Sequence, residues 1–70
     1  MTKLPQVSHE RVVRALKRAG FYVLREGKHI SMTDDRNLVI IPRHHTIKSG
    51  TLKQILDAAE ISLEHFKDLL

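Results

Sequence analysis

Residues 21–41, FYVLREGKHISMTDDRNLVII, decide the fold because they contain three short apolar runs separated by two turn signals. The first run covers residues 21–25 and is rich in aromatic and β-branched side chains, which are typical of strands. The second run covers residues 29–33 and the third covers residues 38–41. One connection contains a glycine and the other is a polar cluster, and both are short enough to be hairpin turns. Three strands joined in this way form an antiparallel meander.

The middle strand alternates strictly between apolar and polar side chains. Ile30 and Met32 point to one face of the predicted sheet, whereas the polar residues of this strand, His29 among them, point to the other. We therefore expect one face to pack against the core and the face with His29 to remain free. Gly27, in the preceding turn, is available for a positive φ.

Helices are predicted on both sides of the meander. Ser8 and Gly20 bound a helix over about residues 8–19, as its N-cap and as the residue that follows its end. A second amphipathic helix covers residues 49–59, and Ser62 begins a short third one. This order, α-β-β-β-α with a helical tail, predicts an α+β fold in which the helices pack on one face of a three-stranded antiparallel sheet.

The size and composition of the chain exclude many classes of protein. With 70 residues and no cysteine, it is too short for a dinucleotide-binding fold or a barrel, and it has no disulfide or thiolate metal site. We expect residues 1–70 to form one domain. Its location is expected to be cytoplasmic, because residues 1–5 do not begin a signal peptide and no apolar run reaches the ~18 residues of a membrane span.

The net charge of +4 is distributed unevenly along the chain. Residues 1–48 contain ten of the twelve Lys and Arg residues, whereas residues 49–70 are acidic overall. A basic body favours a polyanion such as nucleic acid as the partner, although +4 is also ordinary for a small soluble domain.

His29 is the strongest candidate for chemistry. It should lie on the free face of the sheet, with Lys28 beside it and Arg25 across the hairpin. An exposed imidazole in a fixed position can exchange a proton near neutral pH. The alternative is an exposed strand histidine without a catalytic role.

A second group of candidates follows the third strand. Arg43, His44 and Lys48, together with the start of the second helix, form a potential phosphate-binding rim, although a plain polar loop explains the same spacing. A metal site that combines His29 with His44 or His45 lacks the ligand spacings typical of such sites. We therefore expect no metal and no cofactor.

Four short pieces of the sequence resemble the HicA family of bacterial toxins, which are also called YcfA-like mRNA interferases. The order and spacing match from about residue 8 to residue 66, and the four pieces together are more specific than any one of them. They are Ala19-Gly20-Phe21, Arg25-x-Gly27-x-His29, Ile41-Pro42-x-His44 and Gly50-Thr51-Leu52-x-x-Ile55-Leu56.

This resemblance implies a fold like that of double-stranded-RNA-binding domains and a ribonuclease that cuts mRNA and arrests growth. It implies that His29 is the catalytic residue, with Gly27 as the turn glycine of the same Gly-x-His motif. The middle residue of this motif is commonly small in the family, whereas here it is Lys28, and we expect this lysine to add affinity for phosphate. A HicB antitoxin is the implied partner and is expected to cover His29.

Two other functions are compatible with the same sequence. In a non-catalytic RNA-binding module of the same fold, His29 would contact phosphate or ribose, and RNA would bind without being cut. In a subunit that only binds another protein, RNA binding with a strong salt dependence would be absent.

Overall fold

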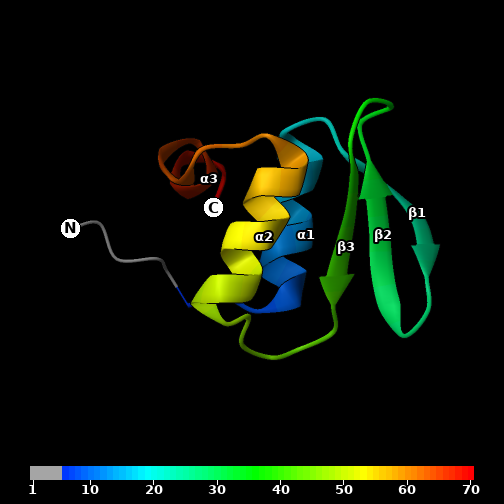
Figure 1. The fold of residues 1–70 in the computed structure, drawn as a ribbon, viewed down its shortest axis with the longest axis horizontal. Coiled ribbons are helices and arrows are strands. Elements are labelled where there is room, and N and C mark those ends of the chain that lie inside the picture. The colour runs from blue at the N-terminus through cyan, green and yellow to red at the C-terminus, as the bar shows by residue number, and fades with distance from the viewer. Residues whose placement is uncertain (1–5) are drawn as a thin grey trace.

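Six elements follow one another along residues 6–70, which is the part of the chain that the computed structural model describes (Figure 1). They are α1 (His9–Arg18), β1 (Tyr22–Glu26), β2 (His29–Thr33), β3 (Leu38–Pro42), α2 (Ser49–Ala59) and α3 (Leu63–Leu69). This order confirms the predicted α-β-β-β-α fold with a C-terminal helix. The prediction that no signal peptide is present concerns residues 1–5, which lie outside the described part.

The three strands form one antiparallel sheet in the order β1-β2-β3. Ile30 pairs with Ile41 and Met32 pairs with Val39, and all four side chains are buried. Figure 1 shows α1 and α2 together on one side of this sheet. The predicted division into a core face and a free face is therefore confirmed.

The end of α1 explains why β1 begins one residue later than the sequence suggested. Gly20 has a φ of 99° and donates its N–H to the carbonyl of Lys17, while Phe21 donates to the carbonyl of Leu16. These two bonds form the Schellman motif, which ends a helix. The side chains of Phe21 and Leu16 are both buried, in agreement with the apolar contact that is common in this motif. Phe21 is therefore part of the motif that ends α1, and β1 begins at Tyr22.

A β-bulge interrupts the pairing of β1 with β2. Val23 lies opposite Met32 and Arg25 lies opposite Ser31, so Leu24 is an extra residue in β1. The bulge shifts the alternation of side chains along the strand. Arg25 consequently lies on the free face of the sheet, on the same side as Ser31.

The hydrophobic core includes all three helices and the inner face of the sheet. Phe66 of α3 is completely buried, which shows that the C-terminal helix is part of the core. Arg18 of α1 holds this helix from outside, since its Nη1 donates to the carbonyls of Leu69 at 2.9 Å and Leu70 at 3.3 Å. Among residues 6–70, none of the helices has the length and apolar character needed to cross a membrane.

The free face of the sheet is more apolar than β2 alone suggested. The neighbouring strands β1 and β3 place four large side chains there that stay about half exposed or more. They are Tyr22 (46%), Leu24 (55%), Leu38 (58%) and Ile40 (47%). Apolar side chains that remain exposed together on one face are typical of interaction surfaces.

Candidate functional site

His29 lies where the β1–β2 hairpin enters β2, and its side chain is exposed. It shares the free face of the sheet with Ser31, because Ile30 between them is buried. The imidazole Nδ1 lies 3.1 Å from the carbonyl oxygen of Lys28. A carbonyl oxygen only accepts, so Nδ1 carries the proton and Nε2 of the neutral ring is left as an acceptor.

Arg43 joins the end of β3 to the hairpin that carries His29. Its Nε donates to the carbonyl oxygen of Gly27 at 2.8 Å, while the Gly27 N–H donates to the carbonyl of His29 at 3.1 Å. The structure thus places Gly27, His29 and Arg43 close together at the tip of this hairpin.

The expectation of a positive φ at Gly27 is wrong. In residues 6–70 the glycine with a φ in the left-handed region is Gly20, and a Cβ added at Gly27 would meet no atom within 4 Å. The turn between β1 and β2 forms without a left-handed residue at Gly27. Gly27 therefore belongs to the site through its carbonyl oxygen.

Arg25 and Lys28 supply positive charge beside His29. Arg25 lies on the free face because the bulge places it opposite Ser31, and Lys28 is exposed in the connection just before β2. Neither side chain is buried, so both retain their hydration and can approach a phosphate group from solvent.

His44 and Lys48 occupy different positions from Arg43. The carbonyl of His44 accepts two bonds from the start of α1, while its own side chain is exposed. Lys48 is the N-cap residue of α2 and makes no capping bond with its side chain. Of these three predicted rim residues, Arg43 alone is hydrogen-bonded to the hairpin with its side chain.

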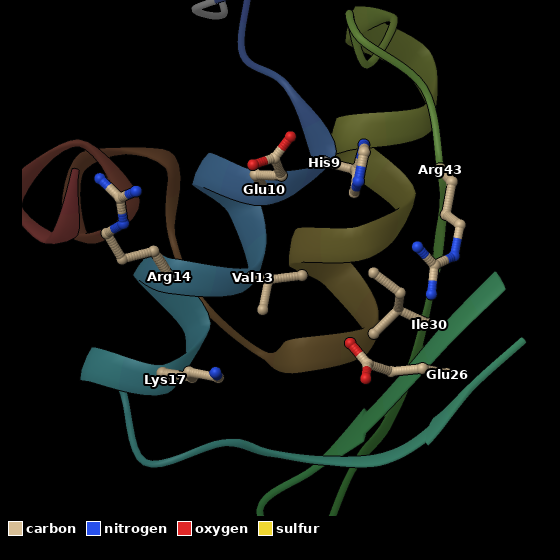
Figure 2. Close-up of a pocket in the computed structure, with 8 residues that line it drawn as sticks. All are labelled: His9, Glu10, Val13, Arg14, Lys17, Glu26, Ile30 and Arg43. Atoms are coloured by element: carbon tan, nitrogen blue, oxygen red, sulfur yellow. The ribbon is translucent and has the colours of Figure 1, made fainter.

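Figure 2 shows a hollow between α1 and the hairpin, on the helix side of the sheet. Its volume is about 440 Å³, and its apolar lining comes from Val13 and Ile30. Arg14, Lys17 and Arg43 supply the cations around it. Arg43 therefore both contacts the hairpin that carries His29 and lines this hollow.

The hollow also contains groups that the sequence did not identify as functional. Glu26 extends into it from β1, because the bulge places Glu26 opposite the inward-facing Ile30. His9 lines it from the first turn of α1, with its backbone N–H 3.0 Å and its Nδ1 2.9 Å from the carbonyl of His44. No local pattern reveals this contact, since the two histidines are 35 positions apart.

The described residues, 6–70, contain no group of three or more His, Cys, Asp or Glu side chains arranged to hold a metal ion. His29, His44 and His45 are not assembled into such a group. The groups that the structure places near His29 include the ammonium of Lys28 and the guanidinium groups of Arg25 and Arg43.

The family model described as HicA toxin of bacterial toxin–antitoxin matches residues 10–61. This span includes the hairpin with His29, Arg43 and most of the hollow. No curated protein gives a significant match to the chain.

Proposed function

Because the chain belongs to the HicA family of toxins of bacterial toxin–antitoxin systems, we propose that it is an endoribonuclease, an mRNA interferase that uses His29 for acid–base catalysis. The observation that carries this proposal is the placement of His29. Its imidazole is exposed at the end of a hairpin, its Nδ1 is bound by the Lys28 carbonyl, and its Nε2 is free to exchange a proton with a substrate.

RNA contains its own nucleophile, the 2′-hydroxyl, so the protein has only to transfer protons and to stabilise the charge on the phosphorus. Neutral His29 takes the proton of a 2′-hydroxyl at Nε2, the 2′-oxygen bonds to the adjacent phosphorus, and the bond to the 5′-oxygen breaks. The imidazolium returns its proton to the leaving 5′-oxygen, which gives a 2′,3′-cyclic phosphate and a free 5′-hydroxyl. This route requires neither a metal nor a cofactor. A positioned acid–base residue contributes typically about 10²–10⁴-fold to such a rate.

The cations around His29 bind the RNA backbone and stabilise the extra negative charge that develops on the phosphorus. Arg43 has the most defined position of these, because its Nε is held by Gly27. The proposed RNA-binding residues are Arg25, Lys28, Arg43, His44 and Lys48.

The antitoxin partner of this toxin is, in our proposal, a HicB-type protein that covers His29 from the free face of the sheet. This face has exposed apolar groups on both neighbouring strands, at Leu24 of β1 and at Leu38 and Ile40 of β3. Their burial stabilises a complex by about 25 cal/mol per Å² of apolar surface. An acidic rim on the partner would accelerate binding to this basic chain.

The decisive experiment incubates the purified protein with end-labelled single-stranded RNA in EDTA. Wild type is compared with His29→Ala and with His65→Ala, a matched control at another exposed histidine, in α3. We expect wild type and His65→Ala to produce 2′,3′-cyclic phosphate ends, and His29→Ala to bind RNA without cutting it.

Each contrary result points to a different conclusion. Salt-sensitive binding by wild type without cleavage would show a non-catalytic RNA-binding module. Cleavage of a DNA strand at a comparable rate would contradict the mechanism, because DNA has no 2′-hydroxyl. Unfolding of His29→Ala, seen by circular dichroism, would contradict a purely catalytic role.

A further inference from the structure

Figure 2 shows the hollow between α1 and the hairpin, which is lined by the inward-facing Ile30. His29 precedes Ile30 in the strand and so lies on the opposite side of the sheet. Apart from Arg43, the residues that line the hollow take no part in the proposed reaction. Arg43 connects the two places. It lines the hollow while its Nε is bound to Gly27, two residues before His29. A ligand that extends around the tip of this hairpin would therefore contact both the hollow and the face of the sheet that carries His29.

His9 is held in the hollow with one nitrogen free. Its Nδ1 and its backbone N–H both lie within 3.0 Å of the same oxygen, the carbonyl of His44. Because this oxygen only accepts, Nδ1 carries a proton, and Nε2 is left for a ligand in the hollow. A neutral His9 accepts a hydrogen bond at Nε2, whereas a protonated His9 donates one.

The other side chains that line the hollow differ in chemistry and match the parts of a nucleotide. The cations Arg14, Lys17 and Arg43 each suit a phosphate group. The carboxylates of Glu10 and Glu26 each suit a hydroxyl or amino group that donates a hydrogen bond. Val13 and Ile30 offer an apolar surface to the face of a base. The volume of about 440 Å³ lies at the small end of the range for ligand sites, which is roughly 300–1,000 Å³.

We propose that this hollow binds one unpaired nucleotide of the RNA strand, next to the bond that is cut at His29. The inference rests on the proposed ribonuclease function and names a subsite for its substrate. The strand passes over Gly27, so that one phosphate lies at His29 and the neighbouring nucleotide lies between α1 and the hairpin. His9 and Lys17 are then RNA-binding residues of this chain.

The test measures binding of a fluorescein-labelled single-stranded RNA with 2′-O-methyl riboses, which the proposed mechanism cannot cut. Lys17→Glu is compared with Arg11→Glu. Both positions are exposed on α1 and both variants change the charge by the same amount, but only Lys17 lines the hollow. We expect the Kd to rise about tenfold or more in Lys17→Glu, the size of a lost charge-assisted bond, and less than about threefold in Arg11→Glu.

A second pair of variants tests whether His9 contacts the RNA. In His9→Asn the amide replaces the Nδ1–H donor but offers nothing in place of Nε2, so the helix start is retained and the contact with RNA is lost. His65→Asn is the matched control. We expect a several-fold higher Kd for His9→Asn alone, and the amide signals of Val13 and Ile30 should shift when RNA is added to the wild type.

The outcomes separate this inference from the proposed function. Equal losses in Lys17→Glu and Arg11→Glu would overturn the subsite, even in a protein that cuts RNA. A protein that cuts no RNA but loses binding only in Lys17→Glu would retain the subsite and overturn the ribonuclease. Binding of a 5′-nucleoside monophosphate as tightly as the oligomer would overturn the assignment to an RNA strand, and absence of any binding would overturn both proposals.

Discussion

Arg43 Nε lies 2.8 Å from the carbonyl oxygen of Gly27, and this contact fixes the tip of the β1–β2 hairpin to the end of β3. The two residues are 16 positions apart, so the bond closes a loop of the chain around the whole of β2. A hairpin of two strands is only marginally stable by itself in water. The histidine that follows this tip is therefore held in part by a residue that lies just beyond the end of β3.

The first prediction concerns this bond. We expect Arg43→Ala to lower the kcat of RNA cleavage by about tenfold or more, because a charge-assisted hydrogen bond of about 1.5–3 kcal/mol positions the hairpin. Arg43→Lys retains the charge but not the planar donor. It should therefore bind RNA more tightly than Arg43→Ala, while its kcat stays low. Arg36→Ala, in the turn between β2 and β3, is the control. Equal kcat values for Arg43→Ala and Arg36→Ala would contradict the positioning role.

The second prediction concerns the free face of the sheet. Replacement of Leu38 and Ile40 by Gln should weaken antitoxin binding by at least about tenfold, since each apolar side chain buried in an interface contributes roughly 1.5–3 kcal/mol. Cleavage of RNA by the free toxin should be unchanged, because both residues are exposed and neither supports the core. Isothermal titration with the antitoxin measures the loss. Retention of full affinity, equal to that of Lys53→Gln on α2, would place the interface elsewhere.

The third prediction concerns the end of α2. Glu60 adopts a left-handed conformation with φ 57°, and the N–H of Ile61 closes the helix by donating to the carbonyl of Leu56. Glycine adopts this conformation without steric cost, so Glu60→Gly should raise the free energy of unfolding by about 1 kcal/mol. Urea denaturation measures this change. Glu60→Ala is the control, because it also loses the hydrogen bond from Asn37 but keeps the strain; an equal gain in Glu60→Ala would rule out the backbone explanation.

The fourth prediction concerns acid stability. The backbone N–H groups of Asn37 and then of Arg36 donate to the carboxylate of Asp34 and lower its pKa below the usual 3.8. A lowered pKa in the folded state means that the carboxylate stabilises the fold above about pH 3.8, and that this contribution disappears as the pH falls through the lowered value.

Thermal unfolding of wild type and Asp34→Asn between pH 7 and pH 2 measures this effect. The amide retains an acceptor oxygen but does not titrate in this range, so wild type should have the higher Tm at neutral pH. The two Tm values should converge as the pH falls below 3.8. A constant difference across the whole range would be evidence against this role of Asp34, and Asp57→Asn on α2 controls for the change in net charge.

Much of the fold could be predicted because its signals are local. The alternation of Ile30 and Met32 identifies the buried face of β2, and Gly20 marks the end of α1. Phe21 shows the limit of such patterns, since a buried aromatic residue before a strand is consistent with either a strand or a helix end. The backbone bond to Leu16 decides between them, and this bond has no signal in the sequence.

The candidate site could be predicted only in part, for the same physical reason. His29 and Gly27 are adjacent to a recognisable turn, so a short motif reveals them. The position of His9 depends on a carbonyl 35 residues away, and the position of Glu26 depends on the bulge at Leu24. Contacts of this kind are determined by the packing of distant elements, and no spacing rule describes them.

The bulge in β1 is a determinant of charge distribution around the hairpin. Because side chains alternate from one face of a sheet to the other, the extra residue Leu24 sends Arg25 to the face of His29 and Glu26 to the side of the helices. Regular pairing of the same residues beyond Val23 would place Arg25 opposite Ile30 and Glu26 opposite His29, and would so exchange the guanidinium and the carboxylate between the two faces. The irregularity of one residue in this strand thus decides which sign of charge stands on each side of the sheet at the hairpin.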